Sequence, residues 1–157
     1  MTISLRPAVP GDELAVARVH VRAWQIGYRG LLPDAYLDNL RAEDRAPRYT
    51  FAAATPSTLV AVDAALIVGL ATTGGDELLA LHVDPDHWGR GLGRALIAAA
   101  RAGLAGAGQA TAILWILDGN ARANRFYRAD GWAPDGEART ATVWGVEVNE
   151  RRYRRAL

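Results

Sequence analysis

Apolar and polar positions alternate in several short segments of the chain, a pattern typical of β-strands with one buried face. Residues 2–6 are the first of these segments. Residues 58–63 and 66–73 follow as two strands joined by a tight turn. Residues 76–83 come next, after a Gly-Gly turn. The last three segments therefore predict an antiparallel meander.

Three further strands are predicted in the second half of the chain. Residues 111–117 read TAILWIL, a continuous apolar run that we expect to be buried on both faces. Residues 139–144 and 146–154 are separated by Gly145 and predict a closing hairpin.

Apolar residues at helical spacing predict the helices that lie between these strands. Residues 12–27 have the pattern of an amphipathic helix, and residues 33–40 and 43–54 that of two shorter ones. Residues 92–105 and 120–129 predict two more. The combined pattern is that of an α/β (α+β) fold, and we expect one domain over residues 1–157.

Composition narrows the classes of function. The chain has no Cys, which excludes disulfides and thiolate chemistry, and its three His residues show no paired ligand spacing, so no metal site is predicted. The net charge of +1 gives no indication of nucleic-acid binding. No apolar run of about 20 residues and no N-terminal leader are seen, so we expect a cytoplasmic protein without a membrane segment.

A Gly- and Arg-rich turn lies between the apolar segment 76–83 and the helix that begins near residue 92. Pro85 ends the strand, because proline restricts the residue before it and donates no hydrogen bond. The first N–H groups of a helix have no partner in the chain, and the helix dipole favours negative charge there. Strand, Gly-rich turn and helix together predict a phosphate site.

The spacing of the glycines distinguishes between phosphate-binding motifs. A Walker A loop requires Lys, which this chain lacks, and the dinucleotide pattern G-x-G-x-x-G does not fit. The pattern R-x-x-G-x-A does fit, as Arg90, Gly93 and Ala95. It resembles the acetyl-CoA pyrophosphate loop of the GNAT N-acetyltransferase superfamily. The alternative is an ordinary Gly-rich connection packed on a sheet.

A second segment, residues 114–132, strengthens this resemblance. It has a strand, an acidic-Gly-Asn turn, a helix and a Gly-aromatic pair, and the matching residues are Asn120, Phe126, Tyr127, Gly131 and Trp132. The first helical region, with its bulky half-polar side chains, resembles the acceptor wall of small bacterial members of the family. The resemblance covers nearly the whole chain, which is identified as a member of the superfamily.

The resemblance implies a fold and a reaction. The fold is a mixed, mostly antiparallel sheet of about seven strands, splayed between the fourth (76–83) and fifth (111–117), with helices on both faces. The reaction is transfer of acetyl from acetyl-CoA to a primary amine by direct attack in a ternary complex. The lack of Cys disfavours an acetyl-enzyme. The alternative function is a non-catalytic acyl-CoA-binding or sensing module.

The resemblance also assigns the cofactor contacts. Backbone groups of Leu81, His82 and Val83 would bond the pantetheine arm, with the Val83 amide as the oxyanion donor. The amides of the loop would hold the pyrophosphate; they belong to Gly91, Leu92, Gly93, Arg94 and Ala95. Arg90 and Arg94 would add positive charge, and Asn120 would bond the pantetheine chain or cap its own helix.

Two side chains are predicted to move protons. Tyr127 matches the tyrosine that the family places near the cofactor sulfur, where a phenol can protonate the departing thiolate; the alternative is a core tyrosine. Glu77 is the candidate general base, acting through water. Alternation puts Glu77 on the same side of the strand as Val83 unless a bulge intervenes. His82, or water alone, is the rival base.

The acceptor is not defined by these motifs. Trp24, Tyr28 and Glu77 are the candidate acceptor contacts, although the two aromatic residues could equally pack on the sheet. Small amines and protein N-termini both remain open as acceptors, and so does a longer acyl group. The lack of an acidic excess argues against a strongly cationic acceptor. The arginine-rich segment 151–155 is expected to be the exposed face of the last strand. The alternative is that this strand lies at an edge of the sheet and makes a dimer contact.

Overall fold

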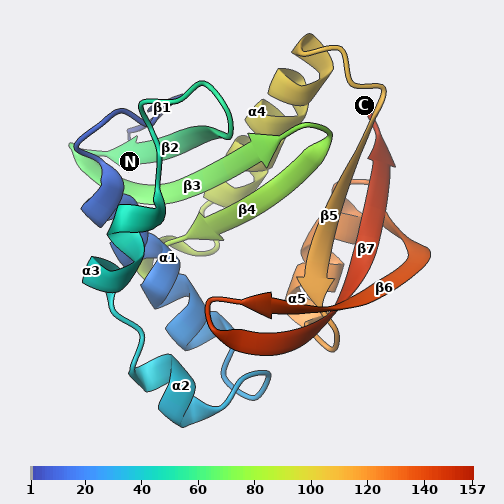
Figure 1. The fold of residues 1–157 in the computed structure, drawn as a ribbon. Helices are drawn as coiled ribbons and strands as arrows, with labels where there is room; N and C mark the ends of the chain where they lie inside the picture. Colours follow the sequence, from blue (N-terminus) through green and yellow to red (C-terminus); the bar gives the residue numbers. More distant parts are fainter. Residues whose placement is uncertain (1) are drawn as a thin grey trace.

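The computed structural model describes residues 2–157, which form a seven-stranded sheet with the strand order β1-β2-β3-β4-β5-β7-β6 (Figure 1). All neighbouring strands are antiparallel except β4 and β5, which are parallel. The strands are β1 (Ile3–Pro7), β2 (Ser57–Asp63), β3 (Leu66–Gly74), β4 (Glu77–Val83), β5 (Thr111–Leu117), β6 (Ala133–Val143) and β7 (Val146–Ala156). The predicted meander and closing hairpin are both confirmed.

Helices cover the two faces of this sheet (Figure 1). On one face lie α1 (Glu13–Gly27) and the short helices α2 (Asp34–Asp38) and α3 (Ala42–Arg45). On the other face lie α4 (Leu92–Gly106) and α5 (Ala121–Ala129). Two 3₁₀ turns, η1 (Ala46–Arg48) and η2 (Pro85–His87), complete the set.

The parallel strands β4 and β5 meet at one end of their length and diverge from there, as the family resemblance implies. Their register contains a single residue pair, Glu77 with Ile113, and the Ile113 amide donates to the Asp76 carbonyl at 3.0 Å. β4 continues to pair with β3 on its other side, and β5 with β7. The sheet therefore consists of two halves joined at one end, which leaves the facing edges of β4 and β5 unpaired beyond that point.

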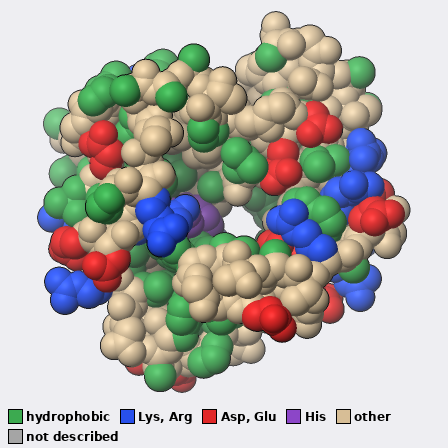
Figure 2. Space-filling model, in the orientation of Figure 1, with side chains coloured by type: hydrophobic (Ala, Val, Ile, Leu, Met, Phe, Trp, Pro, Cys, Tyr) green, Lys and Arg blue, Asp and Glu red, His purple; other side chains and the backbone are tan. Residues whose placement is uncertain are grey.

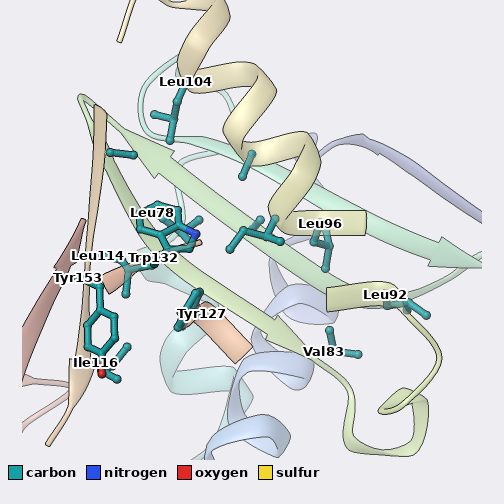
Figure 3. Packing of buried hydrophobic residues seen from close by; sticks show 14 of the residues in the cluster. Leu78, Val83, Leu92, Leu96, Leu104, Leu114, Ile116, Tyr127, Trp132 and Tyr153 are labelled. Carbon is teal, nitrogen blue, oxygen red and sulfur yellow. The ribbon is translucent and has the colours of Figure 1, made fainter. Parts of the chain in front are cut away.

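The largest hydrophobic cluster lies between the sheet and the helices α4 and α5. Leu96 and Ile97 of α4, Leu114 of β5 and Trp132 are at most 2% exposed. Figure 3 shows Leu78 and Val83 of β4 facing the same cluster. Because the cluster draws side chains from both halves of the sheet, it holds the halves in a fixed relation where their strands no longer pair.

A β-bulge changes the direction of the side chains along β4. Thr72 pairs with Ala80 and Thr73 with Leu78, so Leu79 is an extra residue in β4. As a result Leu78 and Val83 both face α4, although they are an odd number of positions apart. Glu77, one residue before Leu78, therefore faces away from Val83, opposite to the uninterrupted alternation.

Three sequence predictions need correction. The third helix was expected over 43–54, but it ends at Arg48, because Pro47 shortens it into a 3₁₀ turn. β5 is buried on one face only; its other face is half-buried, with the Arg139 guanidinium 4.1 Å above the ring of Trp115. β7 is an internal strand, so it cannot supply an edge for a dimer.

The tip of the β6–β7 hairpin crosses the open end of the splay and packs against α1 and α2 (Figure 1). The Tyr36 hydroxyl donates to the Trp144 carbonyl at 2.6 Å. The Trp144 ring packs edge-on against Trp24 of α1, with centroids 4.6 Å apart. This contact closes the splay into a cavity rather than an open groove.

Candidate active site

A cavity of about 530 Å³ occupies the space between β4 and β5. Its walls come from β4, β5, α1, the start of α4 and the start and middle of α5. Most predicted site residues line it: Trp24, Tyr28, Leu81, His82, Val83, Gly91, Leu92, Gly93, Arg94, Asn120 and Tyr127. Glu77, Arg90 and Ala95 do not line it. The splay thus brings together residues from segments far apart in the sequence.

The first turn of α4 forms one end of this cavity. Gly91 precedes the helix with a left-handed φ of 83°, and no side chain caps the N-terminus. Ala95 donates its amide to the Gly91 carbonyl at 3.1 Å, so the helical hydrogen bonds begin there. The amides of Leu92, Gly93 and Arg94 precede that bond, which makes them the donors available to a bound anion.

Gly93 lies where a side chain would crowd the neighbouring helix. A Cβ at this position would come within 3.2 and 3.3 Å of the Phe126 ring of α5. The lack of a side chain thus lets the two helices approach each other at the cavity. By contrast, the equivalent space at Gly91 is open, and there the left-handed φ is what favours glycine.

The β4 edge of the cavity presents backbone groups. Asp84 donates its amide to the Val68 carbonyl of β3 at 2.8 Å. Because hydrogen-bonding direction alternates along an antiparallel strand, the N–H of Val83 points away from β3 and toward β5. By the same alternation, the backbone N–H and C=O groups of Leu81 also point away from β3. Those of His82 point toward β3, where its partner in the register is Leu70. Only Leu81 and Val83 of this trio therefore present backbone groups to the cavity.

An indole fixes the turn that joins β4 to α4. The Trp88 Nε1 group donates to the Val83 carbonyl at 2.8 Å. The Arg122 guanidinium of α5 lies 3.5 Å from the centre of the Trp88 ring. Both side chains line the cavity, and sequence reasoning missed both. They tie the turn to β4 and α5, which keeps the α4 N-terminus in register with the exposed edge of β4.

Tyr127 of α5 lies between the diverging strands, near Val83 on one side and Ile116 on the other (Figure 3). Its ring is buried and packs edge-on against Phe126, with centroids 5.1 Å apart. Within residues 2–157 its hydroxyl has no hydrogen-bond partner. Burial raises the pKa of this phenol above its ordinary value, so it carries its proton at neutral pH.

Asn120 has the capping geometry that was one of its two predicted roles. Its side-chain oxygen accepts the Ala123 amide at 3.1 Å and caps α5. The side-chain NH₂ group remains available as a donor, and the residue lines the cavity. Trp24 contributes another donor, since its Nε1 is buried without a hydrogen-bond partner in the described chain.

A second cavity, of about 310 Å³, adjoins the first. The two share several lining residues: Trp24, Tyr28, Leu79, Ala80, His82, Trp115, Val143 and Glu150. The rest of its wall comes from α1, the 45–51 segment, the Trp144 turn, Pro56 and the strands β2 and β3, which contribute Thr58, Leu70 and Thr72. Figure 2 shows the resulting hollow in the centre of this face. The arrangement suits a reaction between two molecules that enter from different sides.

Two stacked histidines separate this second cavity from the core. The rings of His20 and His82 lie 4.3 Å apart, and His20 Nδ1 is 2.8 Å from the Tyr49 hydroxyl. Burial, assisted by the positive charge of Arg45, lowers the pKa of His82 to about 4. Burial also holds the pKa of His20 well below its ordinary value. Both rings are therefore neutral at physiological pH.

The carboxylate that lines both cavities is Glu150 of β7, which the sequence analysis did not single out. Arg139 donates to it at 2.9 Å. Glu77 lies at the joined end of β4 and β5 and lines neither cavity, and burial raises its pKa. The alternation of apolar and polar residues along the last strand could have indicated that Glu150 faces inward. It could not have indicated which strand lies beside β7.

The described residues show no cluster of His, Asp or Glu that could hold a metal ion. In the same part of the chain, no helix is long and apolar enough to cross a membrane.

Comparisons with solved structures place this arrangement among known folds. A GCN5-related N-acetyltransferase from Rhodopseudomonas palustris superposes with a TM-score of 0.83 at 24% identity, covering 100% of this chain and 97% of that one. The PaiA N-acetyltransferase of Thermoplasma acidophilum, solved with coenzyme A, gives 0.75 at 16%, covering 100% of each chain. YncA of Salmonella typhimurium, solved with acetyl-CoA, gives 0.72 at 17%, covering 99% and 94%. These similarities show the fold.

Sequence comparison supplies the family. No curated protein matches the chain. The model of the acetyltransferase (GNAT) family, however, matches residues 15–132, which include α1, the α4 turn, Tyr127 and Trp132. That match spans most of the chain, and the splayed sheet agrees with it. This chain therefore belongs to the GNAT acetyltransferase family.

Proposed function

We propose that this protein transfers an acetyl group from acetyl-CoA to an amine, by direct attack of the amine on the thioester. The observation that carries the proposal is the cavity at the splay. It combines an uncapped helix N-terminus, the unpaired edge of β4 and a protonated phenol, and it opens into a second cavity. Structures of two proteins with this fold contain coenzyme A or acetyl-CoA.

The residues present suit the two ends of acetyl-CoA. The amides of Leu92, Gly93 and Arg94 would hold the pyrophosphate, whereas the Ala95 amide is already bonded to the Gly91 carbonyl. The side chains of Arg90 and Arg94 would add positive charge. The backbone groups of Leu81 would bond a pantetheine amide as a neighbouring strand does, with the Asn120 side-chain amide as a further donor. The thioester would then lie close to Tyr127.

The Val83 amide is the proposed oxyanion donor. When the amine attacks, a C–N bond forms and the carbonyl oxygen takes up negative charge. A fixed backbone N–H directed at that oxygen is worth about 3 kcal/mol in the transition state. Trp88 holds the carbonyl of the same residue, which keeps this peptide group in place.

Tyr127 is the proposed general acid. As the C–S bond breaks, the sulfur leaves as a thiolate and takes the proton of the phenol. Burial favours the protonated phenol, because a phenolate in the cavity would lose its hydration. The attacking nitrogen releases a second proton as the amide forms, and this proton, carried by water, would return the phenolate to the phenol before the next turnover.

The proton of the amine must leave toward a base. A free amine has a pKa near 10, so the amine arrives largely as an ammonium ion. Glu77 is proposed to accept that proton through water, although it lines neither cavity, whereas Glu150 lines both. His82 is a weaker candidate, because a group with a pKa of about 4 has little affinity for a proton.

The experiment that tests this function is a thiol-release assay with acetyl-CoA over a panel of amines, followed by initial rates with both substrates varied. Direct attack predicts intersecting lines in double-reciprocal plots. Parallel lines would indicate an acetyl-enzyme and contradict the proposed mechanism. Acetyl-CoA binding without turnover of any amine would favour the sensing module instead. We also expect the enzyme to act in the cytoplasm, in line with its lack of cysteine.

A further inference from the structure

The second cavity has a basic rim and aromatic walls. It is lined by Arg45, the last residue of α3, by Arg48 of η1, and by Tyr49 and Phe51. The Arg45 guanidinium stacks on the indole of Trp144, 4.6 Å from the ring centre, and lies 5.4 Å from the ring centre of Tyr49. In Figure 2 basic side chains lie beside a histidine at the edge of the hollow. We call this region the basic pocket.

Neither arginine of the basic pocket has a carboxylate partner among residues 2–157. Other arginines are ion-paired: Arg139 with Glu150 and Arg152 with Asp135, at 2.9 and 2.6 Å. Arg45 instead has a buried Nε without any hydrogen-bond partner. A buried N–H without an acceptor is unfavourable, although the guanidinium also lies against the rings of Trp144 and Tyr49. The fold therefore keeps a positive charge in this cavity that no part of the described chain neutralises.

The neighbouring groups do not supply the missing charge either. His20 and His82, which lie on the same side, are neutral. Among the residues that line the second cavity, Glu150 is the carboxylate, and it lies on the wall shared with the first cavity. The second cavity thus has a carboxylate at the end near the splay and two arginines at its rim.

We infer that the acceptor is a small zwitterion, an amine that also carries a carboxylate or phosphonate. Its anionic group would bind Arg45 and Arg48, and its amine would point past Glu150 toward the splay. Arginine suits this role because its planar fork donates two parallel hydrogen bonds to a carboxylate or phosphonate. This inference rests on the proposed function and specifies its acceptor.

The walls and the size of the second cavity restrict the acceptor further. Tyr49 and Phe51 stack with centroids 5.2 Å apart, and with Trp144 they give the middle of the cavity an apolar surface. A volume of about 310 Å³ lies at the low end for a small-molecule site. The cavity therefore suits one molecule of amino-acid size with an apolar side chain.

The test uses α-amino acids paired with the amines that remain when their carboxylate is removed. Leucine is paired with 3-methylbutylamine and phenylalanine with phenethylamine, and the phosphonate analogue of phenylalanine distinguishes the two anions. Initial rates of thiol release are measured for each. We expect the anionic member of a pair to have at least about a tenfold higher kcat/KM, since a hydrogen-bonded charge pair is typically worth that much.

Variants of Arg45 and Arg48 test whether the basic pocket causes the preference for anionic amines. Arg48→Gln alters an exposed side chain and should reduce kcat/KM about tenfold for the amines that carry an anionic group. The kcat/KM values for the amines without a carboxylate and the affinity for acetyl-CoA should change little. Arg45→Lys keeps the charge and should reduce the preference less than Arg45→Gln. Arg41→Gln is the matched control, because Arg41 lies in the same segment and lines neither cavity.

The outcomes separate this inference from the proposed function. Turnover of amines with no preference for the anionic member would overturn the inference and leave the acetyltransferase function in place. If no amine is turned over, calorimetric titration of the amino acids into protein saturated with coenzyme A decides. Binding that Arg48→Gln abolishes supports the basic pocket, and absence of binding overturns it.

Discussion

At the scale of single residues, the site depends on groups whose surroundings fix their protonation state. Burial keeps the Tyr127 phenol protonated and the His82 imidazole neutral. Both side chains lie within a few residues of buried apolar positions, His82 next to Val83 and Tyr127 five residues before Trp132. The core thus positions the reactive groups and also sets their charge, because a charged form would lose hydration in the cavity.

Replacement of Tyr127 by Phe should slow turnover without loss of cofactor affinity. The phenol is needed only when the thiolate leaves, so we expect kcat to fall about a hundredfold while the Kd for acetyl-CoA changes less than about twofold. Steady-state kinetics and calorimetry measure the two effects. Tyr153→Phe is the control, since its hydroxyl bonds Asn124 and lines neither cavity. Full activity of Tyr127→Phe would remove Tyr127 from the mechanism.

Replacement of Glu77 by Gln tests the general base. If Glu77 takes up the amine proton through water, kcat/KM should fall about tenfold or more at pH 6.5 and less at pH 9, where more of the amine is already neutral. The comparison variant is Glu150→Gln, which removes the carboxylate that lines both cavities. If the pH dependence of kcat/KM changes only in Glu150→Gln, the general base is Glu150 and not Glu77.

At the scale of elements, β4 connects every part of the site. One of its edges pairs with β3, and the other presents Leu81 and Val83 to the cavity. The bulge at Leu79 lets Leu78 and Val83 both pack on α4, while His82 stacks on His20 of α1. The strand thereby anchors the cofactor side of the sheet to α4 and the acceptor side to α1.

The packing of His82 against α1 predicts an acid-sensitive stability. The unfolded chain binds a proton at this residue near pH 6.5, whereas the folded protein does so only near pH 4. Between these values the unfolded state binds more protons, so stability rises with pH up to about 6.5 and is lost below it. We expect the His82 imidazole to account for about 2 kcal/mol of the stability lost between pH 7 and pH 5.

Urea unfolding of the wild type and of His82→Gln at these two pH values measures this contribution. The variant should lose less stability on acidification than the wild type, because its residue 82 no longer titrates, while His20 still does. An equal loss in both proteins would contradict the shifted pKa of His82.

The sequence predicted those elements whose causes are local. The strand, Gly-rich turn and helix around Gly93 are set by residues next to one another, and so is the cap at Asn120. The bulge at Leu79 has no such signal, since no glycine or proline marks it. Pro47, by contrast, is a local signal for the early end of the third helix, and its effect was underestimated.

The residues that the sequence analysis missed come from segments that meet only in the folded chain. Glu150 reaches the cavity because β7 lies beside β5, and Arg45 reaches it because the Trp144 turn folds back onto α1. Both depend on strand order and on a hairpin contact, which residue patterns within one segment do not encode. The family resemblance supplied the proposed cofactor side of the site and, with Trp24 and Tyr28, part of the proposed acceptor side, to which the structure added Arg45, Arg48 and Glu150.

At the scale of the whole molecule, the site lies between two half-sheets that share one residue pair. The half with β1 to β4 carries the exposed strand edge and α4, and the half with β5 to β7 carries α5 and Glu150 (Figure 1). A ligand held by α4 and by Asn120 therefore contacts both halves. Binding should stabilise the folded protein as a unit, and saturating acetyl-CoA should raise its melting temperature.

The central claim is that this splay binds acetyl-CoA through the first turn of α4, and calorimetric titration tests it most directly. We predict one molecule of acetyl-CoA per chain for the wild type. Gly93→Val should bind about thirtyfold more weakly or worse, because a side chain there collides with Phe126. Gly103→Ala, on the same helix with open space around it, should bind as the wild type does. Absence of binding by the wild type, or undiminished affinity of Gly93→Val, would contradict the account.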